Sequence, residues 1–106
     1  MSVRTYRKGI PSSVSPLFNS TDFDCKCTRP QCTITLIDDN LIEALEELHL
    51  LSGGFKINRG YRCVDHNKEV GGKPDSQHLL GKAADCQSTK GYTGHAMARY
   101  AEQVEL

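Results

Sequence analysis

The residues best suited to chemistry lie in the ten-residue segment from Ser76 to Asp85. This segment contains His78 and, seven residues later, Asp85. Catalytic zinc sites commonly use three protein ligands from His, Asp, Glu or Cys, and keep a fourth position for water. A neutral imidazole from His78 and a carboxylate from Asp85 would supply two of the three. The alternative for such a pair is a surface contact or a buried histidine satisfied by hydrogen bonds.

The residues between the two candidate ligands are suited to positioning them. The Leu79–Leu80 pair can anchor the segment in the core, and Gly81 permits a sharp turn. Small residues then predict a tightly packed strand over 83–86. Because adjacent strand residues point to opposite faces, Asp85 can reach the site while Cys86 faces away from it.

Hydrophobic periodicity and turn residues predict the elements that carry this segment. Residues 1–22 are rich in Ser, Thr and Pro without periodicity, and we expect an extended N-terminal arm. The rest, 23–106, is expected to form one domain. Its predicted elements are a helix over 38–52 capped by Asp38 or Asp39, a strand over 55–59, a short helix over 66–70 capped by Asp65, the strand over 83–86 and a last helix from Gly94 to about Glu105.

Composition excludes some classes of function. The 106 residues are 38% hydrophobic and 25% charged, with a formal net charge of zero. This balance argues against a partner bound mainly through phosphates, such as nucleic acid. We find no signal peptide and no transmembrane segment, so we expect synthesis in the cytoplasm, without membrane insertion.

Five cysteines raise the question of a second metal site. An odd number without a signal peptide indicates reduced thiols more readily than a disulfide framework. Cys25, Cys27 and Cys32 are close in sequence, but their spacing is not a standard zinc pattern. They could be small hydrophobic residues in a loop, or, with one further thiol, a cysteine-based zinc module of a regulatory or binding protein.

The pattern Ser-x-His-x2-Gly-x-Ala-x-Asp, from Ser76 to Asp85, resembles the signature of zinc D-alanyl-D-alanine carboxypeptidases and phage L-alanyl-D-glutamate endopeptidases, the peptidase M15-like group. The upstream Gly60-Tyr61-Arg62 is similar to the Ser-Gly-Tyr-Arg element of that family, with Arg59 in place of Ser. The segments 66–72 and 23–27 also resemble its phage-type members. The resemblance covers about residues 20–105.

The resemblance implies a fold and roles for individual residues. The fold would be α+β, a small hedgehog/DD-peptidase-like domain with helices on a short antiparallel sheet. His78 and Asp85 would bind Zn²⁺, and Arg62 would stabilise the oxyanion, as a permanently charged guanidinium can. Ser76 would support the ligand loop or contact substrate, and Tyr61 would help to bind it. The substrate would be a peptidoglycan stem peptide, reached by an endolysin-like enzyme after release to the cell wall on lysis.

The family also needs a third ligand, a histidine, and a carboxylate that acts as general base. Both belong to a segment after the last helix, and no such segment precedes Leu106. His95 is the candidate substitute, while His66 and His49 are expected on helical surfaces. We therefore expect the 106-residue chain to lack the last strands of the fold, to bind zinc weakly and to hydrolyse little.

Three explanations fit such an incomplete site. The natural protein is longer, or it is a non-catalytic relative that binds peptidoglycan or serves as a scaffold, or a partner chain completes it. A homodimer through the unpaired sheet edge is one form of the third explanation.

Overall fold

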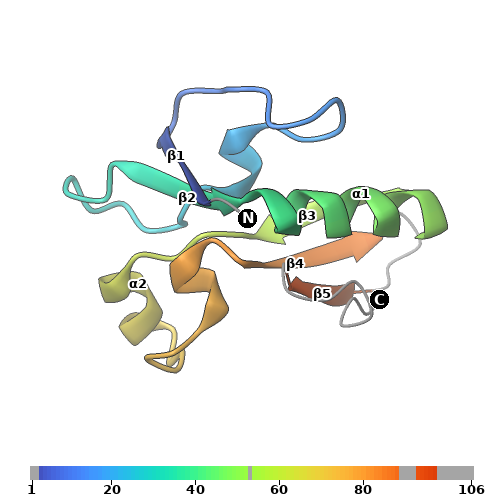
Figure 1. Ribbon diagram of the computed structural model, residues 1–106. Coiled ribbons are helices and arrows are strands. Elements are labelled where there is room, and N and C mark those ends of the chain that lie inside the picture. Colours follow the sequence, from blue (N-terminus) through green and yellow to red (C-terminus); the bar gives the residue numbers. More distant parts are fainter. Residues whose placement is uncertain (1–2, 53, 89–92, 98–106) are drawn as a thin grey trace.

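Two antiparallel sheets form the framework of the protein (Figure 1). The computed structural model describes residues 3–52, 54–88 and 93–97, and the side chains of 3–50 and 54–87. In the first sheet, β1 (Val3–Arg7) pairs with β2 (Ile34–Asp38). In the second, β4 (Ala83–Ser88) lies between β3 (Phe55–Arg59) and β5 (Thr93–Met97). The middle strand of this second sheet therefore carries Asp85.

The helix α1 (Asp39–Ser52) contributes more buried residues to the hydrophobic core than any other described element. It begins where predicted, because the Asp38 carboxylate accepts a hydrogen bond from the Asn40 N–H at 2.7 Å. Its predicted apolar stripe is buried at four positions: Leu41, Ile42, Leu45 and Leu48. Because these positions recur at helical spacing, one face of α1 packs against the core and the other faces solvent.

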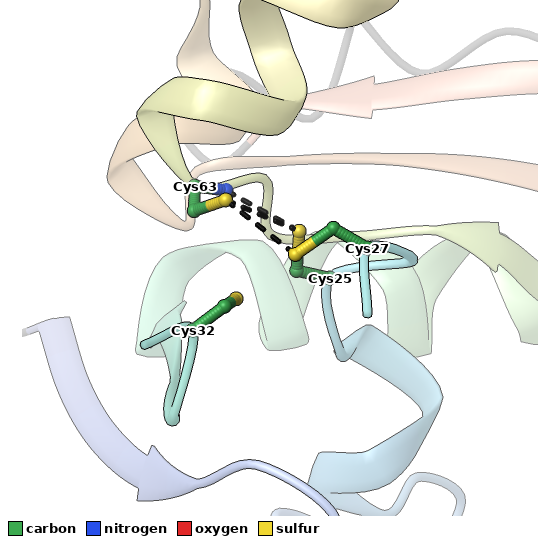
Figure 2. Close-up of side chains that lie close together, drawn as sticks. All are labelled: Cys25, Cys27, Cys32 and Cys63. Atoms are coloured by element: carbon green, nitrogen blue, oxygen red, sulfur yellow. Dashed lines mark hydrogen bonds between the residues drawn. The ribbon is translucent and has the colours of Figure 1, made fainter. Parts of the chain in front are cut away.

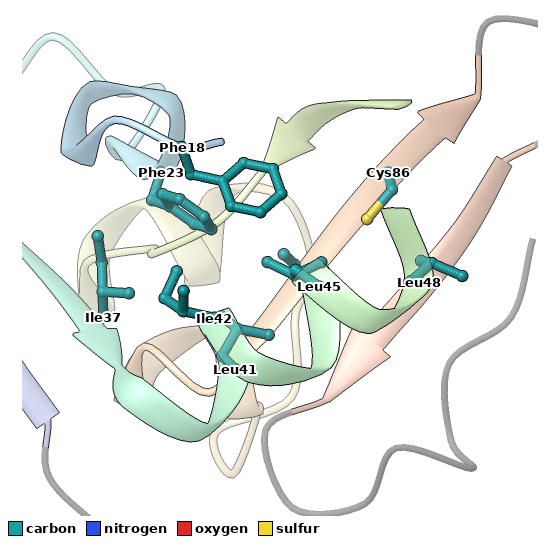
Figure 3. Close-up of a cluster of buried hydrophobic side chains, with 9 residues drawn as sticks. Phe18, Phe23, Ile37, Leu41, Ile42, Leu45, Leu48 and Cys86 are labelled. Carbon is teal, nitrogen blue, oxygen red and sulfur yellow. The ribbon is translucent and has the colours of Figure 1, made fainter. Parts of the chain in front are cut away.

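The core lies between α1 and the segments that cross its apolar face (Figure 3). Phe18 and Phe23 come from the N-terminal part of the chain, Ile37 from β2 and Cys86 from β4. Phe18 stacks on Phe55 with ring centroids 5.9 Å apart. Burial of Cys86 confirms that it points away from the face that carries Asp85.

Three short helices connect these elements. They are η1 (Ser20–Phe23), α2 (Val64–Glu69) and η2 (Gln77–Leu80). The prediction that Asp65 caps α2 was wrong, because Cys63 is the N-cap and its Sγ accepts from the His66 N–H. The helix starts earlier as a result. Leu80 is 47% exposed, so the predicted Leu79–Leu80 anchor is also wrong for its second residue.

The strands were predicted unevenly. The bounds of β3 and the start of β4 match the prediction, but β1 and β2 were missed. The predicted last helix was wrong over 94–97, where pairing with β4 forms β5 (Thr93–Met97) instead. Its remaining positions lie outside the described residues. The segment expected as an N-terminal arm contains β1 and contributes the buried Phe18.

The architecture is α+β, as predicted. Helices are interspersed among the strands, and every strand pair in the described part of the chain is antiparallel, unlike the parallel units of an α/β fold. No helix within the described ranges has the length and apolarity needed to span a membrane.

Candidate functional site

The helix η2 holds His78 in a defined place. Ser76 caps this helix, and its Oγ accepts a hydrogen bond from the His78 N–H at 3.3 Å. Gly81 ends it with a φ of 72°, in the left-handed region that glycine adopts at little cost. The Gly81 carbonyl accepts from the Asp38 N–H at 2.9 Å, so the turn is joined directly to the end of β2.

The His78 ring is oriented by the backbone. Its side chain is buried, and Nδ1 lies 2.7 Å from the Gly60 carbonyl oxygen. A carbonyl can only accept, so in the neutral ring Nδ1 carries the proton and Nε2 carries the lone pair. Such a contact to a carbonyl is typical of histidines that bind metal through their other nitrogen. The sequence gives no sign of it, since the acceptor is backbone.

Asp85 faces the Nε2 side of this ring. Its Oδ2 lies 3.6 Å from His78 Nε2, and its side chain is 34% exposed. Two ligands bound tetrahedrally to one zinc at ordinary zinc–nitrogen and zinc–oxygen distances lie about 3.4 Å apart. The two atoms are therefore spaced as neighbouring ligands of one metal ion would be. The donor set, one imidazole and one carboxylate, also suits zinc.

The neighbouring strands bring two further residues beside Asp85. The register of β3 and β4 places Arg59 opposite Asp85, next to a bulge between Ile57 and Arg59. Bulges of this kind redirect side chains and are frequent near active sites. On the other side, the register of β4 and β5 places the backbone of His95 opposite Asp85. His95 is thus on a strand beside the candidate ligand and not on a helix.

Arg62 lies on the loop between β3 and α2, which is hydrogen-bonded to the His78 backbone. Its backbone N–H donates to the His78 carbonyl at 3.1 Å, and its Nη2 donates to Ser76 Oγ at 3.3 Å. Its Nε is buried and has no hydrogen-bond partner among the described residues. A buried guanidinium N–H without a partner is costly, and an incoming acceptor would satisfy it.

A small pocket of about 230 Å³ adjoins this loop. Gly60 and Tyr61 form part of its wall. Most of the other lining residues carry or can carry positive charge: Lys26, Arg59, Arg62 and His66. Burial, and then the nearby thiols, raise the pKa of Tyr61, which keeps its hydroxyl neutral. The pocket could accept a carboxylate or a peptide carbonyl.

The other two histidines have different surroundings. The His49 ring contacts the rings of Phe18 and Phe55, with centroids 6.3 and 5.5 Å away. His66 Nδ1 lies 3.6 Å from the Glu69 carboxylate on the same helix. Both lie on helices, as expected, but both are half-buried rather than on the surface.

Four cysteines form a second group of metal-ligand type (Figure 2). The Sγ atoms of Cys25, Cys27, Cys32 and Cys63 all lie within 4.8 Å of one another. Burial opposes ionisation of Cys27, yet hydrogen bonds from the Arg29 backbone and the neighbouring thiols lower its pKa to about 6. Burial and the same neighbours raise the pKa of Cys32 to about 12. Sequence spacing suggested the first three, but only the fold brings Cys63 to them.

Comparison with known proteins adds one match. A family model described as Peptidase M15 matches residues 16–106. The match includes the segment that carries His78, Asp85 and Arg62, and also the four clustered cysteines. Neither the comparison with curated proteins nor that with solved structures finds a match.

Proposed function

Because the chain belongs to the peptidase M15 family, we propose that it is a zinc-dependent peptidase domain acting on peptidoglycan stem peptides. The reaction would be that of a D-alanyl-D-alanine carboxypeptidase or an endolysin-like endopeptidase. Family membership supports hydrolysis by a metallopeptidase, while the substrate rests on the resemblance of the Ser76 to Asp85 segment. One observation carries the proposal: His78 Nε2, with its ring oriented by Gly60, lies 3.6 Å from the Asp85 carboxylate.

His78 and Asp85 would hold the metal. The chemistry that a bound zinc ion supplies is a water ionised near neutral pH, and positive charge beside the scissile carbonyl oxygen. His78 is fixed by its hydrogen bond to Gly60, so it would need no reorganisation to bind. Asp85 lies on the central strand β4, and backbone pairing with β3 and with β5 fixes this strand on both sides. This rigidity supports a catalytic role, because ligand geometry must be held closely.

Arg62 would stabilise negative charge on the substrate carbonyl oxygen. Ser76 Oγ holds one end of the guanidinium, while the buried Nε has no partner among the described residues. Donors aimed at an oxyanion before reaction cost no reorganisation when the charge develops. Tyr61 and the cationic pocket would bind a peptide end or a side-chain carboxylate beside it, and stem peptides offer such groups.

Replacement of Asp85 tests the proposal directly. We expect the purified Asp85→Asn variant to bind less zinc than the wild type, measured by mass spectrometry of bound metal, and to release less peptide from purified peptidoglycan, measured by chromatography. An amide binds zinc far more weakly than a carboxylate of the same shape. Asp75→Asn is the matched control, because Asp75 is exposed in the preceding turn. Zinc that Asp85→Asn removes, without any release of peptides by the wild type, would instead support a non-catalytic peptidoglycan-binding relative.

The third ligand is assigned by a parallel variant. If His95 completes the centre, His95→Ala loses as much zinc as His78→Ala does. If zinc binding is unchanged in His95→Ala, the ligand lies elsewhere, as the family resemblance implies. The same assay on the wild-type chain tests the expectation that it binds zinc weakly and hydrolyses little.

A further inference from the structure

The four clustered cysteines are separate from the proposed catalytic centre in chemistry and in ligands. We propose that Cys25, Cys27, Cys32 and Cys63 bind a second zinc ion, which has a structural role and fixes the loop that carries Arg62. Three of the thiols come from the loop between η1 and β2, and the fourth from the N-cap of α2. Figure 2 shows the four side chains converging from these two segments.

The sulfur separations fit a metal better than a disulfide. Cys63 Sγ lies 3.8 Å from Cys25 Sγ and 3.7 Å from Cys27 Sγ. Four sulfurs at about 2.3 Å from a tetrahedral zinc lie about 3.8 Å from one another. A disulfide would need about 2.05 Å between two of them. All five cysteines are free in the structure, consistent with reduced thiols.

Backbone hydrogen bonds already surround two of the sulfurs. The Cys63 N–H donates to Cys25 Sγ, and the His66 N–H donates to Cys63 Sγ, each at 3.4 Å. Donors of this kind orient a ligand and stabilise the charge on a thiolate. They come from the start of α2, where helix N–H groups lack partners within the helix. Backbone donors therefore help to orient two of the four proposed ligands.

Charge is compensated by a neighbouring lysine. On binding, the four thiols release their protons and the complex of zinc with four thiolates carries a net charge of −2. Lys8 Nζ lies 3.5 Å from Cys32 Sγ and 3.8 Å from Cys27 Sγ, and it donates to the Cys27 carbonyl at 2.8 Å. The positive charge of Lys8 offsets part of this negative charge. Lys8 directly follows β1, so this strand places it beside the cluster. Soft thiolates select zinc over magnesium or calcium.

Four protein ligands indicate a structural role. A site with four cysteines leaves no position for water or substrate, unlike a catalytic zinc site. Cys63 directly follows Arg62, and Tyr61 donates its backbone N–H to the Phe23 carbonyl at 2.9 Å, two residues before Cys25. A metal on the cluster would add a second link between the same two segments. Cys32 also lines a pocket of about 680 Å³ beside β1.

Release of zinc by thiol modification tests this in the unmutated protein. The chain is purified with zinc under reducing conditions and then treated with a mercurial reagent, while a chromogenic indicator records free zinc. We expect about one zinc per chain to be released by this treatment. The same release is expected from His78→Ala, which lacks the proposed catalytic ligand. The two sites are therefore tested independently.

Cobalt substitution gives a second readout. We expect cobalt in the cluster to show thiolate-to-metal charge-transfer bands, lost in Cys27→Ser and in Cys32→Ser but kept in Cys86→Ala. Cys86 is the matched control, since it is buried in the core away from the cluster. Absence of these bands from the wild type, no zinc release on modification, or iron in place of zinc would each overturn the proposal.

Discussion

At the scale of single residues, the geometry of the site depends on which side-chain atoms already make hydrogen bonds. His78 uses Nδ1 for the Gly60 carbonyl, which leaves Nε2 directed at the Asp85 side. Ser76 bonds both the His78 backbone and the Arg62 guanidinium through one hydroxyl. One serine therefore positions a candidate metal ligand and a candidate oxyanion donor together. This explains physically why a serine at the start of the segment suits the motif.

Arg62 offers a prediction at this scale. We expect Arg62→Lys to lower kcat for peptidoglycan hydrolysis by about 10²- to 10³-fold, the usual effect of losing one oxyanion donor. A lysine keeps the charge but loses the planar fork that reaches both Ser76 and a substrate oxygen. Zinc content should not change, because Arg62 is not a ligand. A parallel loss of zinc would show instead that Arg62 maintains the metal site.

At the scale of elements, the important feature is the junction between η2 and β4. Gly81 forms this junction with its φ of 72°, and its carbonyl accepts from Asp38 at the end of β2. A Cβ at this position would overlap the Leu36 backbone. The turn that leads from His78 toward Asp85 is thus packed directly on β2. The glycine of the motif serves both the turn and this close approach.

Two alanine substitutions separate strain from overlap at such glycines. We expect Gly71→Ala to reduce the free energy of unfolding by about 1 kcal/mol, because its φ of 74° is strained for alanine but no atom lies near its added Cβ. Gly81→Ala should cost clearly more, about 2–3 kcal/mol, since backbone must also move. Urea denaturation measures both values. Equal losses would mean that the Leu36 backbone can move away from the added Cβ at little cost in free energy.

At the scale of the whole molecule, the core joins segments far apart in sequence. Phe18, from the segment expected to be an arm, packs edge-to-face on Phe23 at 6.1 Å and stacks on Phe55. It is 6% exposed. A domain of 106 residues has one modest core, so each large buried ring contributes a substantial part of its stability.

Phe18→Ala measures how far the N-terminal segment belongs to the domain. We expect a loss of about 3–5 kcal/mol in the free energy of unfolding, the usual cost of removing a buried phenylalanine. Leu17→Ala is the matched control, because the neighbouring Leu17 is 46% exposed. Its loss should be well under 1 kcal/mol. A small effect of Phe18→Ala would indicate that the segment is a dispensable arm.

The sequence by itself determined the features that depend on local pattern. The apolar stripe of α1, its Asp38 cap, the strand β3 and the turn at Gly81 all follow from periodicity and residue type within a short window. The candidate ligand types, imidazole at His78 and carboxylate at Asp85, are likewise readable from one ten-residue segment. Even β2 left a local signal, since residues 34–37 are an apolar run interrupted by one threonine, which also favours strands.

Only the tertiary structure decided which distant residues meet. Cys63 joins Cys25 from 38 positions away, and β4 pairs with β5 where helical periodicity predicted a helix. These outcomes depend on packing and backbone pairing between segments, whose free energy exceeds weak local propensities. The Gly60 carbonyl that orients His78 has no side-chain signature at all. The motif therefore predicts the chemistry of the site, and the fold decides which backbone groups and distant side chains lie beside it.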